Sequence, residues 1–322
     1  MNEKKKNNFR SAYLITKPLQ YVNATNIPDE RPKDCLIIKS FAGAETFVRN
    51  VSAYSIHWDK VFSFESRSEA FEFIVLNKNK YNRIFLDSDI GLFYHLSQFS
   101  GIDIFTYEEG IGSYRKIRDT TKLIEKLKAV IWSILGFNNW IGGNKFTKGI
   151  YLYNPAVFRQ LIPNEKKPVY KLNNSFHSSA LHLKELSYLH ENIDFGRYKN
   201  ENLLVYLSSW EISESILSKL ESFPTHIKIL KPHPNTLTKT RLTSHFDEVI
   251  TSAIPVEIFL IKVSKYCNQL VIVHENSSAL LYLNDVQYLE VNISTLKFKE
   301  EYRKIRELIL NDTVVLPRKL VV

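Results

Sequence analysis

The fold is decided by residues 83–110, which read RIFLDSDIGLFYHLSQFSGIDIFTYEEG. The run RIFLDS (83–88) is predicted to be a strand, because its central residues are apolar and polar residues bound it. GLFYHLSQFS follows with helical character, and DIFTYEEG (103–110) is the next predicted strand. Parallel strands need a crossover connection, so a strand, a helix and a strand in this order predict a parallel α/β sheet.

The same alternation extends through most of the chain. Before residue 83 we expect three strands, and after the 103–110 strand one more, at 11–16, 34–41, 60–65 and 148–158. A second alternating series begins at residue 202, with strands expected at 202–210, 226–234, within 269–283, and at 286–292. Several of these strands are nearly continuous apolar runs, which is typical of strands covered on both faces.

This pattern predicts an α/β protein with two Rossmann-like domains that face each other across a cleft. We place the N-terminal domain at 1–160, a linker at 161–200 and the C-terminal domain at 201–322. The last helix, expected at 297–310, is a candidate to pack back on the N-terminal domain. In such pairs of sheets the ligand lies beside the carboxyl ends of the strands, so the loops after the strands are the candidate site.

Composition narrows the class of protein. The formal net charge of +9 indicates an anionic partner, namely a nucleic acid, a phosphorylated substrate or a membrane surface, although a lysine-rich soluble protein would also show it. Cys35 and Cys267 are far apart in apolar runs, so a disulfide framework or a zinc site is not expected. The opening MNEKKKNNFR lacks the apolar segment of a signal peptide, and no run is long enough to span a membrane. We expect a cytoplasmic protein that can rest on the inner face of the membrane.

The loop after the 103–110 strand contains two adjacent carboxylates, Glu108 and Glu109, followed by Gly110 and Gly112. A carboxylate at the carboxyl end of a strand can act as a general base on a substrate hydroxyl. Neighbouring side chains alternate in direction, so one acid can face the cleft while the other anchors the loop. The glycines allow tight backbone geometry there. The alternative is a solvated turn with two surface acids.

The loop after the 226–234 strand reads Lys231-Pro232-His233-Pro234. Two prolines fix the backbone on either side of the histidine. A positioned imidazole can hydrogen-bond a phosphate and assist a leaving group, and the lysine adds positive charge. The alternative is an ordinary proline turn with an exposed histidine.

The loop after the 269–274 run is the third motif loop, and two other loops supply polar side chains without a specific pattern. Asn276, Ser277 and Ser278 follow the 269–274 run and can cap a helix or bind an anion. Ser208 and Ser209 follow the 202–210 strand and can supplement that anion site. After the first strand, the candidates for contact with a sugar are Lys17, Gln20 and Asn23.

Residues 119–136, DTTKLIEKLKAVIWSILG, predict a helix with one broad apolar face and basic residues beside it. Such a helix can lie on a membrane surface. Alternatively it packs its apolar face on its own domain.

The three motifs together resemble the bacterial lipooligosaccharide sialyltransferases and polysialyltransferases, whose pattern is an acidic pair with Gly, then HP, then SS or ST. The chain supplies them in that order as Glu108-Glu109-Gly110, His233-Pro234 and Ser277-Ser278, and its opening LITKPLQYVNA is also similar. The resemblance implies a GT-B arrangement of the two domains. It also implies inverting transfer of sialic acid from CMP-sialic acid to a surface glycan, such as a capsule or a lipooligosaccharide, without a metal or other cofactor.

The resemblance also implies roles for the motif residues. Glu108 or Glu109 deprotonates the acceptor hydroxyl; we favour Glu108 as the base, with Glu109 supporting the loop. His233 assists departure of the donor phosphate, which Ser277 and Ser278 bind, and Lys231 lies near the cytidine. Residues 115–200 match no motif, so the acceptor stays open.

Four alternatives stay open. The donor can be another CMP-activated sugar, namely pseudaminic acid, legionaminic acid or Kdo. Asp87 and Asp89 have the form of a metal-binding pair and could hold Mg²⁺. A nucleic-acid-binding protein would suit the charge, but the basic residues are scattered rather than gathered in a stripe. A Ser-His-Glu hydrolase would lack the usual G-x-S-x-G turn.

Overall fold

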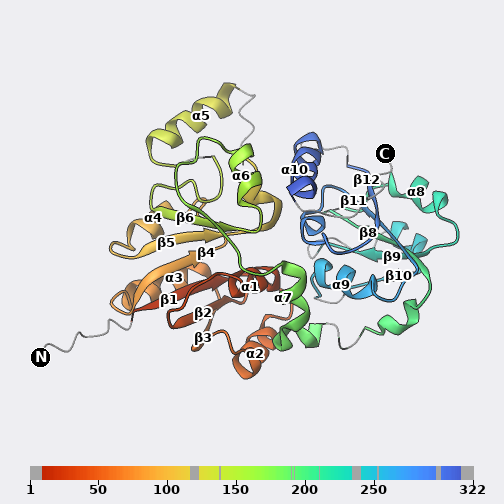
Figure 1. Cartoon of the computed structure of the whole chain (residues 1–322), viewed down its shortest axis with the longest axis horizontal. Coiled ribbons are helices and arrows are strands. Elements are labelled where there is room, and N and C mark those ends of the chain that lie inside the picture. The colour runs from red at the N-terminus through yellow and green to blue at the C-terminus, as the bar shows by residue number, and fades with distance from the viewer. Residues whose placement is uncertain are drawn as a thin grey trace, which may run out of the picture. The chain divides into compact units, whose positions relative to one another are not determined.

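The structure is a computed structural model that describes residues 9–116, 123–137, 139–189, 191, 193–209, 211–233, 241–251, 254–294 and 299–312. The chain divides into two compact units, Met1–Leu186 and Ser187–Val322. Each unit contains its own parallel sheet flanked by helices, as the alternation predicts (Figure 1).

The first unit has a seven-stranded sheet in the order β3-β2-β1-β4-β5-β6-β7, with all neighbouring pairs parallel. The strands are β1 (Arg10–Ile15), β2 (Lys33–Ile38), β3 (Lys60–Phe64), β4 (Tyr81–Leu86), β5 (Asp103–Tyr107), β6 (Thr147–Leu152) and β7 (Val169–Lys171). The helices are α1 (Pro18–Thr25), α2 (Ala44–Tyr54), α3 (Arg67–Leu76), α4 (Phe93–Ser97), the 3-10 helix η1 (Gly110–Tyr114), α5 (Leu123–Ile134), α6 (Pro155–Leu161) and α7 (Phe176–His182).

Alternating side chains of the central strands build a core on each face of this sheet. On one face Ala12 and Leu14 of β1 pack with Phe71 of α3 and Leu96 of α4. On the other face Tyr13 stacks on Phe85 at 4.4 Å between ring centroids. Both faces are therefore apolar, which explains why the strands read as continuous hydrophobic runs.

Residues 161–200, for which the sequence predicts a linker, contribute β7 and α7 to the first unit. Leu172 donates its main-chain N–H to Leu152, and Tyr170 stacks on Tyr151 at 4.8 Å. A three-residue edge strand leaves little periodic signal in a sequence, and its pairing becomes visible only in the sheet. The 3-10 helix η2 (Lys184–Leu189) carries the chain from the first unit into the second.

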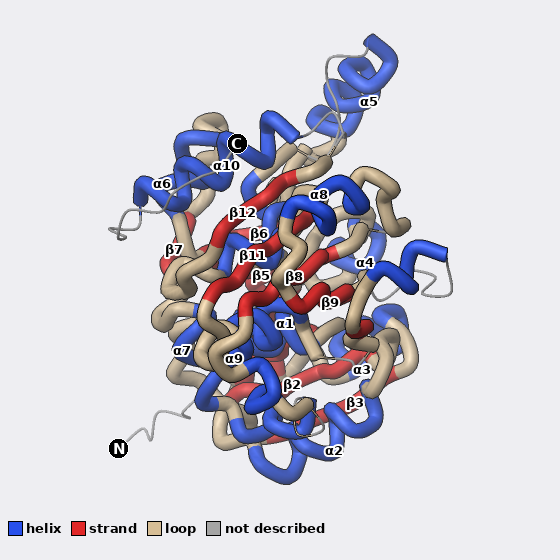
Figure 2. Tube along the Cα trace, turned by 90° about the vertical axis from the view of Figure 1, so that its right-hand side faces the viewer, coloured by secondary structure: helices blue, strands red, loops and turns tan. Residues whose placement is uncertain are grey.

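The second unit has a five-stranded parallel sheet in the order β10-β9-β8-β11-β12, and Figure 2 shows β9, β8, β11 and β12 side by side. Its strands are β8 (Asn202–Leu207), β9 (Ile227–Lys231), β10 (Glu248–Val249), β11 (Gln269–His274) and β12 (Leu289–Asn292). Its helices are η3 (Phe195–Tyr198), α8 (Ile216–Ser222), η4 (Arg241–His245), α9 (Val256–Val263), η5 (Ser278–Tyr282) and α10 (Lys299–Asp312). The central position of β8 brings the loops after β8, β9 and β11 to one edge.

Cys35 is buried and Cys267 is partly exposed, and both are free cysteines. No helix among the described residues is both long and apolar enough to cross a bilayer.

Candidate active site

The acidic pair lies where the sequence places it, directly after β5, whose neighbours in the sheet are β4 and β6. Glu108 is almost completely buried, with 1% of its surface exposed. Its Oε2 accepts hydrogen bonds from the Tyr114 hydroxyl and, at 2.8 Å, from the main-chain N–H of Tyr153. Its main-chain carbonyl accepts from Asn23 Nδ2 at 2.8 Å. Glu108 therefore fastens the loop to η1 and to the end of β6.

Glu109 is the accessible acid of the pair. Its side chain is 28% exposed, and its Oε1 lies 2.7 Å from Lys17 Nζ. The main-chain N–H of Glu109 donates to Ser113 Oγ at 2.8 Å, which fixes the residue at the start of η1. A base must be reachable by its substrate, so the geometry favours Glu109 as the base and Glu108 as the anchor. This is the reverse of the assignment that we favoured from the sequence.

Both glycines of this loop have a structural requirement. Gly110 has φ +79°, a backbone conformation that residues with a Cβ rarely adopt. At Gly112, a Cβ would lie 3.0 Å from Glu109 Oε2 and 3.6 Å from Ile141 Cδ1. Gly112 therefore leaves the space that the Glu109 carboxylate uses.

Of the three candidate sugar contacts, only Lys17 is accessible, with a side chain 45% exposed. Gln20 and Asn23 are completely buried. The Gln20 amide bonds to Thr16 and Asp87, and the Asn23 amide bonds to the Glu108 carbonyl and the Tyr153 hydroxyl. The prediction that Gln20 and Asn23 contact a sugar is therefore not supported, because both amides already hold the loops of this edge in place.

The Asp87 and Asp89 carboxylates accept hydrogen bonds from different segments of the first unit. Asp87 Oδ2 accepts from Arg67 at 2.6 Å and from Gln20 Nε2 at 2.6 Å. Asp89 uses both oxygens to hold the 142–147 segment, accepting from the N–H groups of Gly142 and Asn144 and from the Thr147 hydroxyl. Burial raises the pKa of Asp89. Both carboxylates thus serve hydrogen bonds within the first unit, and among the described residues no cluster of three or more potential His, Cys, Asp or Glu ligands occurs.

In the second unit the loop after β9 places Lys231 and His233 beside β8. The His233 N–H donates to Ser208 Oγ at 3.2 Å, and the Ser208 N–H donates to the Lys231 carbonyl at 3.4 Å. Pro232 is buried and His233 is partly exposed. Pro234 lies outside the described residues. The β8 and β9 loops are thus joined through Ser208, which the sequence named only as a supplement.

Lys231 is an unusual cation because it is buried at the end of a strand, with 9% of its surface exposed. Burial lowers the pKa of Lys231 to about 8, although nearby Glu257 acts in the opposite direction. Its ammonium donates to the Ile250 carbonyl at 3.3 Å. A buried cation of this kind favours an anionic ligand, which would compensate for lost hydration.

The loop after β11 is tightly constrained. Asn276 has φ +60°, and its amide is held between Ser294 Oγ and Asn292 Nδ2, each at 2.8 Å. Ser277 precedes η5, and its Oγ accepts from the Ala279 N–H. Ser277 and Ser278 are both partly exposed, so their hydroxyls can reach a ligand. The helix after them is a 3-10 helix of five residues, so the two hydroxyls rather than a helix N-terminus are the candidate donors to a ligand.

A buried network of hydrogen bonds and an ion pair lies behind this loop, and the sequence did not predict it. His274 Nδ1 accepts from the Ser277 N–H at 3.2 Å, so Nε2 carries the ring proton toward Glu290 Oε1, also at 3.2 Å. Arg306 of α10 lies with Nε 3.4 Å from Glu290 Oε2, and the Tyr302 hydroxyl donates to the Ser277 carbonyl at 3.0 Å. Burial acts to raise the pKa of Glu290, but His274 and Arg306 together bring it below its usual value.

The sequence did contain a signal for this network. Arg306 falls on the apolar stripe of the last helix with Tyr302, Ile305 and Ile309, all of them buried. A charged residue on a buried stripe needs a charged partner, and Glu290 is the acid within the strand LEVN. The partners could be paired only once the fold was known.

Ser209 and Glu275 connect the loops after β8 and β11. Glu275 Oε1 accepts from the Tyr206 hydroxyl at 2.6 Å, and Ser209 Oγ lies 3.5 Å from Glu275 Oε2. The three loops of the second unit are therefore linked to each other by hydrogen bonds along one sheet edge.

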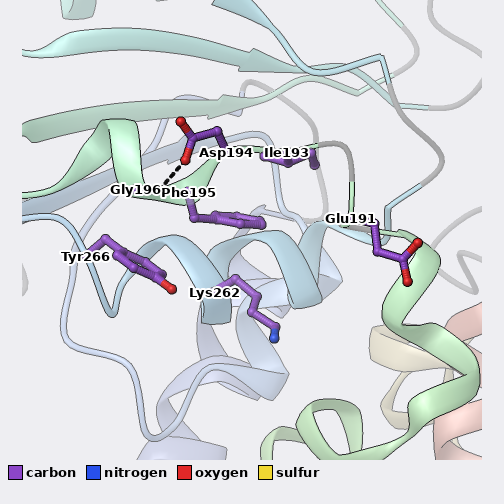
Figure 3. A pocket seen from close by; sticks show the side chains of 7 residues that line it. All are labelled: Glu191, Ile193, Asp194, Phe195, Gly196, Lys262 and Tyr266. Atoms are coloured by element: carbon purple, nitrogen blue, oxygen red, sulfur yellow. Dashed lines mark hydrogen bonds between the residues drawn. The ribbon is translucent and has the colours of Figure 1, made fainter.

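A pocket of about 650 Å³ lies elsewhere in the second unit, lined among others by Phe195, Lys262 and Tyr266 (Figure 3). Phe195 precedes β8 and Tyr266 precedes β11, so this pocket lies toward the amino ends of the strands. The candidate site residues follow the carboxyl ends.

The fold was compared with known proteins. It is similar to the crystal structure of an alpha/beta-galactoside alpha-2,3-sialyltransferase from the luminous marine bacterium Photobacterium phosphoreum, with a TM-score of 0.57 and 12% identity over 95% of this chain and 96% of that one. It is also similar to the wall teichoic acid polymerase TagF soaked with CDPG, with a TM-score of 0.50 and 9% identity over 96% and 81% of the two chains.

At these identities the likeness concerns the fold. The predicted GT-B-like α/β fold is thereby confirmed, and the resemblance to bacterial sialyltransferases holds at that level. No protein-family model matches the sequence. A search of curated proteins gave no match.

Proposed function

We propose that the protein is an inverting glycosyltransferase that transfers sialic acid from CMP-sialic acid to a hydroxyl of a bacterial surface glycan. The observation that carries the proposal is the placement of all three predicted motif loops after the carboxyl ends of strands, in a fold shared with a sialyltransferase. The first unit supplies an accessible carboxylate, and the second supplies cationic and hydroxyl groups suited to a phosphate.

On the acceptor side, Glu109 takes the proton of the attacking hydroxyl. Lys17, 2.7 Å away, holds the carboxylate in position. The acceptor oxygen forms the new bond to the anomeric carbon while the bond from that carbon to the CMP phosphate oxygen breaks. Attack from the face opposite CMP inverts the configuration.

On the donor side, the leaving group is the CMP phosphate, whose negative charge grows as the bond breaks. Lys231 and His233 lie at the end of β9, and Ser277 and Ser278 follow β11. Preorganised donors stabilise developing charge most effectively when they are held rigidly before the reaction. Because these groups can compensate the phosphate charge, we propose that departure of CMP needs no metal ion.

The site does not distinguish sialic acid from other CMP-activated acids, so pseudaminic acid, legionaminic acid and Kdo are the alternative donors. The hydrolase alternative is disfavoured by His274. Its two ring nitrogens face the Ser277 main chain and Glu290, so neither is available to activate a serine hydroxyl.

The proposal is tested by nucleotide binding and then by a donor screen. We expect CMP at about a hundred times its Kd to stabilise the folded protein by about 2.7 kcal/mol, and UDP to stabilise it less. Thermal unfolding with each nucleotide measures this, and CDP is a third arm because of the TagF likeness. A protein that CMP leaves unshifted at high concentration lacks the proposed donor site. Mass spectrometry of products formed from each CMP-activated acid then identifies the sugar.

A further inference from the structure

Helix α5 presents its apolar side chains to solvent rather than to its own unit. Six of them, and Leu135 directly after the helix, are between 52% and 80% exposed. The six are Leu123, Ile124, Leu127, Val130, Ile131 and Ile134. Half of the large exposed apolar side chains of the described residues lie in this one segment. The alternative in which the helix packs this face on its own domain is therefore wrong in this structure.

The opposite side of α5 is the side that contacts the protein. Ala129 and Trp132 are partly buried, and the Trp132 ring lies 5.2 Å from that of Phe137. Phe137 forms a bridge with Asn144, whose N–H donates to Asp89. The end of α5 is thus fixed to the first unit, while both views show the helix standing off from the sheet (Figures 1 and 2).

Charge is placed at both margins of the apolar face. At 100° per residue the six side chains span an arc of roughly 120°, with Lys126 and Lys128 roughly 40° beyond its two edges. Both lysines are exposed. Lysines in this position can extend their ammonium groups to lipid phosphates while the apolar arc enters the acyl region.

We propose that α5 docks the protein on an anionic lipid surface. A second copy of the chain fits less well, because it would bring the same lysines against each other. An anionic bilayer supplies both the apolar layer and the opposite charge. This contact is independent of sugar transfer, so either proposal can fail without the other.

The experiment measures flotation of the full chain with phosphatidylcholine vesicles, with and without phosphatidylglycerol. We expect clear binding only with phosphatidylglycerol. Replacing Leu127, Ile131 and Ile134 together by Ser should weaken partitioning by at least ~30-fold, because three apolar side chains no longer enter the bilayer. Because all three are exposed, the melting temperature should stay unchanged, which shows that the variant is folded.

Two control variants make the result specific. Ile56→Ser with Leu76→Ser removes two apolar side chains elsewhere in the first unit, each more than 70% exposed, and should leave binding unchanged. Lys126→Glu with Lys128→Glu should abolish the preference for phosphatidylglycerol. The proposal is overturned if the wild type ignores the anionic vesicles or if the triple serine variant still binds them. It is also overturned if light scattering shows a dimer that the triple variant loses, since a second copy then covers the face.

Discussion

Replacing Glu108 and Glu109 one at a time should show that one acid is needed mainly for stability and the other mainly for catalysis. Glu108→Ala leaves the Tyr114 hydroxyl and the Tyr153 N–H without their buried acceptor. An unsatisfied buried donor costs about 1–3 kcal/mol, so two of them predict a loss of about 2–6 kcal/mol in the free energy of unfolding. Glu109→Ala removes a partly exposed ion pair with Lys17, which predicts a loss of at most about 1 kcal/mol.

The catalytic effects should run in the opposite order. Glu109→Gln keeps the shape but removes the base, so kcat/KM should fall by about 10²–10⁴-fold. Glu108→Gln keeps an oxygen that can accept both hydrogen bonds, so most of the activity should remain. Urea unfolding measures the first effect, with the two units allowed separate transitions. Initial rates with CMP-sialic acid, or with the donor that the screen identifies, measure the second. Near-normal turnover in Glu109→Gln, together with a collapse in Glu108→Gln, would refute the assignment.

Substitutions at Gly112, Glu290 and Lys231 test the other parts of the two candidate sites. Gly112→Ala should lower kcat/KM by about 10–100-fold, because the alanine Cβ would lie 3.0 Å from Glu109 Oε2 and displace the carboxylate. The urea midpoint of the variant checks that the fold is kept. Glu290→Gln should raise the donor KM about 10-fold with a smaller change in kcat, since it loosens the His274 support of the Ser277 loop; an unchanged KM would contradict this role. Because burial lowers the pKa of Lys231 to about 8, calorimetry should show CMP binding weakening as the pH rises through 8, and Lys231→Met should lack this dependence. The unfolded chain keeps the ordinary lysine pKa of 10.5, so between pH 8 and 10.5 it binds more protons than the folded protein. Raising the pH through that window should therefore increase the free energy of unfolding of the wild type relative to that of Lys231→Met.

Much of the fold could be predicted because buried parallel strands leave a strong local signal. The predicted strands match β1 to β6, β8, β9, β11 and β12 in position, with ends that differ by a few residues. The two strands that were missed, β7 and β10, are three and two residues long. Strands so short are defined by their hydrogen-bonding neighbour rather than by their own periodicity.

The candidate site was predicted in part. Position after a strand is a local property, so the loops holding Glu109, His233 and Ser277 were found. Accessibility is not local: Gln20 and Asn23 were candidates for contact with a sugar, and both are buried, with amides that hold neighbouring loops. The same limit applies to α5, whose amphipathic pattern does not say which way its apolar face turns.

The sequence by itself therefore determined the alternation of strands and helices, the order of the motifs and the residue types available for chemistry, because each of these depends on neighbours along the chain. The tertiary structure decided which acid of the YEEG loop is buried, which charges pair behind Ser277, and that the apolar face of α5 is exposed. Those outcomes depend on contacts between segments as far apart as Glu108 and Tyr153, or Glu290 and Arg306. Burial and hydrogen-bond partners belong to the assembled sheet, and they separate two adjacent glutamates that the sequence presents as equals.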